Sequence, residues 1–149
     1  MVKISDVAHP DFDRLLEFCL PFAQQTLKKY DDFHPFAAKV GLDGELSPLA
    51  IYGDDHEPQA APVEQYEALL RRLTAEGDVK AVALCYDSVV FANGEDGGSQ
   101  DAIAVALEHV DGECITSFLP YRKRFLLGYK YDALVAQPAE KRFLVDGPA

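Results

Sequence analysis

The sequence predicts an α+β fold in the order α-β-β-α-β-β-β, with a single mostly antiparallel sheet of about five strands and the helices packed on one face. Three observations predict it. Two segments carry apolar residues at helical spacing, two are centred on Asp-Gly dipeptides, and one long segment is apolar on both alternating faces. The length of 149 residues fits one domain over residues 1–149, with a basic and aromatic C-terminal segment from about residue 121.

Two helices are expected. The first covers residues 11–30, where apolar side chains recur every three or four positions and form one stripe. Pro21 lies in its middle and offers no N–H to the carbonyl of Glu17, so we expect a kink or a split into two short helices. The second helix begins at Pro62 and ends near Glu76.

The first hairpin is expected over residues 36–52. Its Asp43-Gly44 dipeptide favours a two-residue turn, which would pair Ala38 with Leu49. Pro48 cannot donate to a ladder, so the second strand should lie at an edge or contain a bulge. Residues 79–91 are apolar on both faces, which is typical of a central strand.

The second hairpin combines residues 101–110 and 113–121 around Asp111-Gly112. A two-residue turn pairs His109 with Cys114, with Cβ atoms about 5 Å apart. An imidazole beside a thiol can take its proton, so a small hydrolase or transferase using Cys114 and His109 is one hypothesis. Simple packing of both residues is the stronger interpretation, since neither an orienting third group nor an oxyanion hole is recognisable. Beyond residue 120, residues 129–136 and 142–145 fit short strands or irregular structure.

The charge excludes some function classes. The chain has 14 basic and 25 acidic residues, a formal net charge of −11, which argues against generic binding to nucleic acids or anionic membranes. Residues 1–120 hold 8 basic and 22 acidic residues, whereas residues 121–149 hold 6 and 3. The three cysteines are far apart, and the N-terminus has no apolar run. Free thiols in a cytoplasmic protein are therefore expected.

No metal or cofactor is expected. Residues 54–57 (Asp-Asp-His-Glu) and the Gly-rich loop at residues 93–98 have ligand-like composition, but they lack the spacing of a known metal or nucleotide motif. Solvated loops are the better interpretation. His9 and His34, each followed by proline, fit capping or loop positions.

A basic and aromatic segment is one candidate for contact with a partner, and it could equally stack within the protein against its own acidic surface. Residues 121–125 and 128–131 interleave cations with aromatic rings, which are common at protein interfaces. The candidate contact residues are Tyr121, Arg122, Arg124 and Tyr129, together with Asp54, Asp55 and Glu57 of the acidic loop.

The favoured hypothesis is a non-enzymatic module that binds another protein. One form is an acidic inhibitor or immunity-type protein for a basic partner, because opposite charge speeds association. The Cys114 and His109 enzyme is the alternative. A homodimer formed through a sheet edge or by pairing of helices also stays open, and the Pro48 strand would then be a partly blunted edge.

Several short motifs together resemble a family of small uncharacterised bacterial proteins. The resemblance covers residues 33–137 and implies a compact bacterial cytoplasmic domain without an assigned catalytic residue. The element order is similar to that of profilin-like and roadblock-type domains. The motifs that carry the resemblance are Phe33-His34-Pro35-Phe36-Ala37-Ala38, Leu42-Asp43-Gly44-Glu45, Ile51-Tyr52-Gly53-Asp54-Asp55, Asp101-Ala102-Ile103-Ala104-Val105 with Glu108-His109, and Leu119-Pro120-Tyr121-Arg122.

Overall fold

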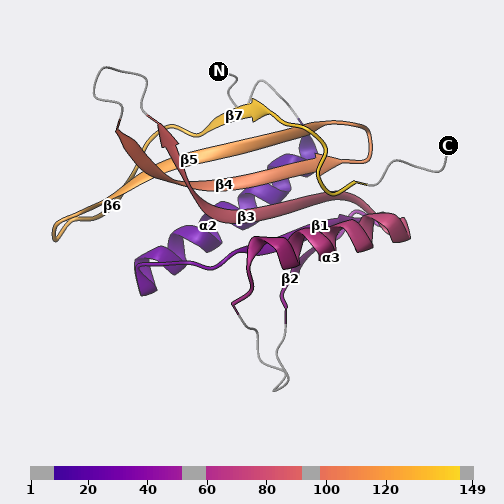
Figure 1. Ribbon diagram of the computed structural model, residues 1–149, viewed down its shortest axis with the longest axis horizontal. Coiled ribbons are helices and arrows are strands. Elements are labelled where there is room, and N and C mark those ends of the chain that lie inside the picture. Colours follow the sequence, from indigo (N-terminus) through magenta and orange to yellow (C-terminus); the bar gives the residue numbers. More distant parts are fainter. Residues whose placement is uncertain (1–8, 52–59, 92–97, 145–149) are drawn as a thin grey trace.

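The computed structural model describes residues 9–51, 60–91 and 98–144 of the chain. It contains two helices and one sheet, and the α+β class expected from the sequence is confirmed (Figure 1). The elements are, in chain order, α2 (Pro10–Tyr30), β1 (Phe36–Gly41), β2 (Leu46–Leu49), α3 (Val63–Glu76), β3 (Val79–Phe91), β4 (Ser99–His109), β5 (Cys114–Arg124), β6 (Gly128–Tyr131) and β7 (Val135–Pro138).

The sheet has seven strands in the described part of the chain, not about five. Its order is β2-β1-β3-β4-β5-β6, with β7 also paired to β5, and every pairing is antiparallel. The two additional strands come from the C-terminal segment. β3 lies between β1 and β4, and the Pro48 strand β2 lies at an edge, as expected.

The two helices cover opposite faces of the sheet, so the prediction that both pack on one face is wrong (Figure 1). β3 explains the arrangement, because its alternate residues contribute to two separate apolar layers. Ala81, Ala83 and Cys85 pack in the α2 layer, whereas Val82 and Leu84 pack in the α3 layer. A strand that is apolar on both faces needs a cover on each side.

Helix α2 continues through Pro21 as a single 21-residue helix, so of the two expected outcomes, a kink or a split, the split does not occur. Pro21 and Glu17 are both exposed, and water can therefore satisfy the carbonyl that loses its partner. Buried side chains on both sides of the proline hold the helix against the sheet, namely Phe12, Leu15, Leu16, Cys19, Ala23 and Leu27.

Both hairpins turn through three residues instead of two. The N–H of Gly41 donates to the carbonyl of Glu45 at 2.9 Å, and the third loop residue, Gly44, has φ +86°. In the second hairpin Gly112 takes the same position with φ +104°. A glycine with positive φ at the third position is typical of three-residue hairpin loops. Both predicted registers are therefore wrong by one residue, and Ala38 pairs with Pro48.

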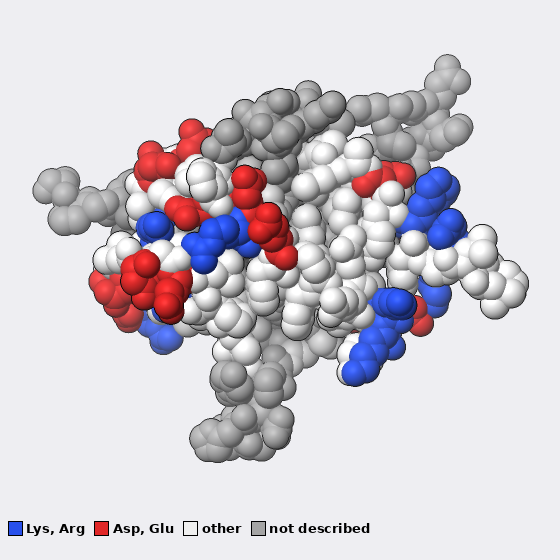
Figure 2. All heavy atoms as spheres, turned by 180° about the vertical axis from the view of Figure 1, so that it is seen from behind, with Lys and Arg blue, Asp and Glu red and all other residues white. Residues whose placement is uncertain are grey.

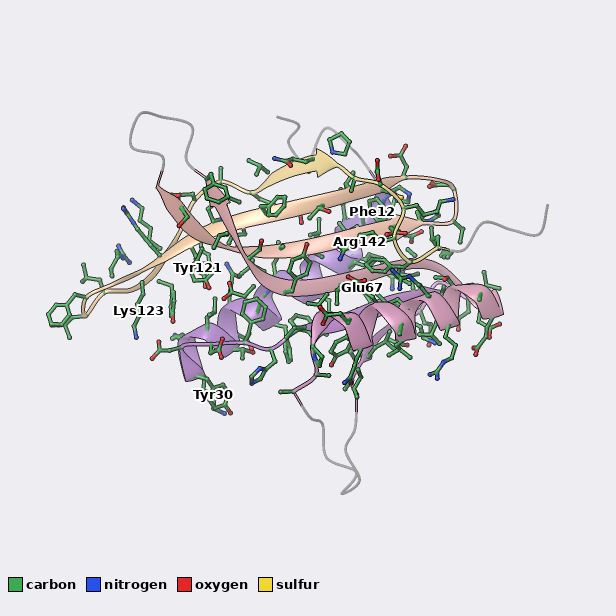
Figure 3. The ribbon with its side chains drawn as sticks, viewed as in Figure 1. Phe12, Tyr30, Glu67, Tyr121, Lys123 and Arg142 are labelled. Atoms are coloured by element: carbon green, nitrogen blue, oxygen red, sulfur yellow. The ribbon has the colours of Figure 1, made fainter. Side chains whose placement is uncertain are left out.

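The end of the described chain folds back onto β4 and α3. Phe143 is fully buried in the α3 layer. The carboxylate of Glu108, whose residue is 2% exposed, accepts the backbone N–H groups of Arg142, Phe143 and Leu144 at 2.7, 3.0 and 3.1 Å. The guanidinium of Arg142 pairs with Glu67 of α3 (Figure 3). Within the described ranges, neither helix is long and apolar enough to cross a membrane.

Candidate interaction surface

The thiol and imidazole that the sequence suggests as a pair lie on opposite faces of the sheet. Cys114 pairs with Glu108, and the N–H of His109 donates to the carbonyl of Glu113. A shift of one residue reverses the face of a side chain. Glu108 faces the C-terminal segment on the α3 side, whereas His109 contacts Asp11 of α2. The predicted cross-strand contact is therefore wrong, because each hairpin loop has three residues.

The Cys114 thiol also has an unfavourable environment for a nucleophile. Burial, and then the charge of Glu108, raises its pKa. A reactive cysteine needs a lowered pKa and an electropositive environment. The geometry thus gives no support to the thiol enzyme hypothesis.

The acidic candidates belong to the loop at residues 54–57. Asp54, Asp55 and Glu57 lie outside the described residues, as do residues 93–97 of the Gly-rich loop. The remaining candidates all lie on β5 and β6.

The tyrosines of β5 and β6 face α2 instead of solvent. Tyr121 is 6% exposed, and its hydroxyl donates to Asp87 of β3 at 2.8 Å. Burial, together with this bond, raises the pKa of Tyr121 above its ordinary value. The ring packs against those of Tyr129 and Tyr131, with centroids 5.8 and 6.1 Å away. Tyr121 therefore packs under the β5–β6 hairpin and offers little exposed surface.

Asp31 joins the β5–β6 hairpin to the C-terminal end of α2 through two side-chain contacts. It is the C-cap residue of the helix, with φ 59°. Its carboxylate accepts the hydroxyl of Tyr129 at 2.9 Å and the ammonium of Lys123 at 2.8 Å. The hydrogen bonds from Lys123 and then Tyr129 lower the pKa of Asp31. The hairpin thus has a defined inner face, which these two contacts bind to the end of the helix.

The outer face of the hairpin carries three cations. Arg122 and Lys130 are directly opposite in the ladder, and Arg124 lies two residues along on the same face. All three are exposed, and none has an ion pair within the part of the chain that the structure describes. Like charges directly opposite one another destabilise a strand pair. An anionic group bound between them would remove that repulsion.

The turn between β5 and β6 exposes three consecutive apolar side chains. Phe125, Leu126 and Leu127, called the hairpin tip below, are 89, 87 and 68% exposed. Leu126 also has φ +61°, which costs a bulky L-residue about 1–2 kcal/mol. The sequence analysis includes Phe125 in the basic and aromatic segment but names none of these three residues as a candidate contact. Their signal is an apolar run placed between Arg124 and Gly128, where a turn would ordinarily be polar.

A groove of about 630 Å³ lies between the hairpin and α2. Leu127, Tyr129 and Tyr131 line one side, and Gln24, Gln25 and Lys28 line the other, together with Pro21, Asp31, Lys123 and Gly128. A second groove of about 420 Å³ is lined by aromatic and other uncharged residues, among them Phe18, Phe22 and Phe36. The first groove joins the apolar side chain of Leu127 to the charged side chains of Lys28, Asp31 and Lys123.

The charges are unevenly distributed along the molecule. On the face drawn in Figure 2, most acidic side chains lie at the end away from the hairpin, whereas basic side chains lie at both ends. The hairpin tip, the outer cations Arg122, Arg124 and Lys130, and the adjoining groove together form a mixed apolar and basic surface. We call this the hairpin surface.

No family model, curated protein or solved structure matches this chain. The resemblance to a family of small bacterial proteins therefore stays a prediction, as does the similarity to profilin-like domains. The hairpin surface is interpreted from its own chemistry.

Proposed function

We propose that the protein is a non-enzymatic interaction module that binds another protein through the hairpin surface. The observation that carries this proposal is the exposed apolar hairpin tip beside three cations that have no ion pair with residues 9–51, 60–91 or 98–144. Burying a Leu or Phe side chain contributes about 1.5–3 kcal/mol, so a partner that covers the tip gains substantial affinity.

The composition of the surface matches that of protein interfaces. Aromatic residues and arginine are enriched at the centres of interfaces, and these centres are surrounded by polar groups. Phe125 and the two leucines would fill an apolar pocket of the partner. Arg122, Arg124 and Lys130 would face acidic side chains at its rim, which also relieves the repulsion between Arg122 and Lys130.

The charge of the rest of the chain favours a protein over other anionic partners. Nucleic acids and anionic membranes present extended negative charge, and residues 1–120 have a net charge of −14 from 8 basic and 22 acidic residues. An acidic protein patch of limited size can contact the hairpin surface without approaching the acidic end of the molecule.

The inhibitor or immunity-type form remains an alternative with a different surface. It would use Asp54, Asp55 and Glu57 against a basic partner, and these residues lie outside the described part. The hairpin-surface form needs an acidic patch on the partner, whereas the inhibitor form needs a basic partner and the three acidic side chains.

Affinity capture with matched baits tests the proposal. One bait is the wild-type protein, and a second carries Phe125→Ser, Leu126→Asn and Leu127→Ser. A control bait carries Leu42→Ser, which changes an exposed apolar residue in the β1–β2 turn. We expect one saturable partner on the wild-type and control baits and its loss from the tip variant. The purified partner should then bind the wild-type and Leu42→Ser proteins with similar affinity and the tip variant more weakly.

Equal capture by the wild-type and tip-variant baits would contradict the proposal. A partner that is lost only when Asp54, Asp55 and Glu57 are changed to Asn or Gln would support the inhibitor form. Sedimentation with vesicles of anionic phospholipid, if it depends on the tip, would replace a protein partner with a membrane surface.

A further inference from the structure

A polar cluster lies where the start of α2 meets the turn between β4 and β5. His9 is the N-cap residue of α2, although its side chain makes no capping bond, and Asp111 lies in the turn. One ligand atom from each of His9, His109 and Asp111 lies within 4.8 Å of the others. This cluster is independent of the hairpin surface, because α2 separates the two by about 30 Å. Figure 3 shows this separation by Phe12 at one end and Lys123 at the other.

Both imidazoles direct a nitrogen towards the same carboxylate. His9 Nε2 lies 2.9 Å from Asp111 Oδ2, and His109 Nδ1 lies 3.3 Å from Asp111 Oδ1. The side chains of His9 and His109 are only 12 and 11% exposed. The ring of His9 stacks on Phe12 with centroids 4.3 Å apart, and this contact limits its rotation. The two histidine nitrogens therefore converge from well-packed positions on the more exposed carboxylate of Asp111.

Asp11 selects the tautomer of His109. Its Oδ2 atom lies 2.8 Å from His109 Nε2, so the N–H at this position donates to the carboxylate. The lone pair is then on Nδ1, which faces Asp111 and also accepts the Asp111 backbone N–H at 3.1 Å. Nδ1 and Oδ1 are two acceptors 3.3 Å apart, and Oδ1 also accepts the backbone N–H of Glu113 at 2.9 Å. A cation bound to both atoms would remove the repulsion between their lone pairs. A carboxylate behind a histidine ligand is a frequent support of metal sites.

We propose that His9, His109 and Asp111 form a binding site for Zn²⁺, with Asp11 orienting His109. Two imidazole nitrogens and one carboxylate oxygen suit this ion, and they leave a fourth position for water. Asp111 is 47% exposed, which gives the ion a path from solvent. Lys80, 3.9 Å from Asp11, offsets the charge of the supporting carboxylate. Zinc displaces the backbone N–H from Nδ1 when it binds.

Zinc titration of the untagged protein, after treatment with a chelator, tests the site. We expect one equivalent to bind by calorimetry and the melting temperature to rise with the zinc concentration. His9→Gln, His109→Gln and Asp111→Asn should each abolish binding. Asp11→Asn should weaken binding about 10- to 100-fold, since it removes only the support of a ligand. His34→Gln is the matched control and should bind as the wild type does.

Cobalt provides a readout that does not depend on stability. Co²⁺ bound to this set of ligands should give a visible absorption band that Zn²⁺ abolishes and that His34→Gln preserves. The proposal would be overturned by the absence of saturable binding, or by equal binding to the wild type and His109→Gln. If a histidine variant fails to fold, the affinity of Asp11→Asn and the cobalt spectrum of the wild type decide the question.

Discussion

The hydroxyl of Tyr129 lies 2.9 Å from the carboxylate of Asp31, at the residue where α2 ends. This contact joins the β5–β6 hairpin to the helix and gives the hairpin an inner and an outer face. Lys123 donates to the same carboxylate. The remaining cations of the hairpin, Arg122, Arg124 and Lys130, are left on the outside.

The Asp31 contact predicts an unusual titration of Tyr129. Burial, and then the bond to Asp31, raises the pKa of Tyr129 to about 12. Asp31→Asn should return the pKa towards the ordinary tyrosine value of about 10. Ultraviolet difference titration measures the change, and Asp13→Asn, at the other end of α2, should leave the Tyr129 titration unaltered. An unchanged titration in Asp31→Asn would show that the contact does not form in solution.

The same two groups predict how stability depends on pH. The pKa of Asp31 is lowered in the folded protein, so its contribution is present above the unfolded pKa and is lost as pH falls through the folded pKa. The pKa of Tyr129 is raised, so its contribution is present below about pH 10 and is lost as pH rises through about 12. Urea unfolding across pH should show both losses in the wild type, and each should diminish in Asp31→Asn.

A substitution of Leu126 should lower the affinity for the partner without lowering the stability of the protein. Asparagine tolerates the left-handed conformation that Leu126 adopts at φ +61°. Leu126→Asn should therefore leave the free energy of unfolding unchanged or raise it by up to about 1 kcal/mol, while affinity for the partner falls. Urea unfolding and calorimetry with the captured partner measure the two quantities. A clear loss of stability would indicate that Leu126 packs within the protein.

Replacing Glu108 by alanine should lower the free energy of unfolding substantially. Its carboxylate accepts three backbone N–H groups while it is 2% exposed. Glu108→Ala leaves these donors without a partner and should cost about 3 kcal/mol, whereas Glu108→Gln retains an acceptor and should cost about 1–2 kcal/mol. Glu140→Ala, an exposed acid in the same region, should change the free energy of urea unfolding by less than about 0.5 kcal/mol.

Burial of the three thiols and the register of the second hairpin predict how fast each cysteine reacts with iodoacetamide. Burial raises the pKa of Cys19 to about 12 and that of Cys85 well above its ordinary value, so both should react with iodoacetamide only after unfolding. Cys114 should react more slowly than free cysteine because its pKa is also raised. His109→Gln should not alter that rate, since the imidazole lies on the other face. A severalfold decrease of the Cys114 reaction rate in His109→Gln would contradict this register and support a contact between the thiol and the imidazole.

The sequence predicts most elements but not the layers or the registers. Periodicity locates both helices, and the Asp-Gly dipeptides locate both hairpins. Each dipeptide fits a two-residue turn or the last two positions of a three-residue loop. The preceding residues, Leu42 and Val110, are apolar and look like strand positions, yet both are exposed in the loops. The apolar pattern of residues 79–91 already indicates two covered faces, and it conflicts with placing both helices on one side.

The candidate sites depend on contacts that sequence spacing does not encode. The segment from Tyr121 to Tyr131 is recognisable as basic and aromatic, but alternation along two paired strands decides which side chains face solvent. His9 and Asp111 are 102 positions apart and meet only because the start of α2 lies beside the β4–β5 turn. A lone histidine before a proline carries no sign of such a partner.

Photo-crosslinking in the cells that make the protein tests the central claim most directly. A photoreactive phenylalanine analogue replaces Phe125 in one strain and Leu42, an exposed residue of the β1–β2 turn, in another. We predict one discrete crosslinked protein from position 125 and none from position 42. A crosslinked product from position 42 alone, or no product from either position in a folded protein, would contradict the assignment of the hairpin surface as the binding site.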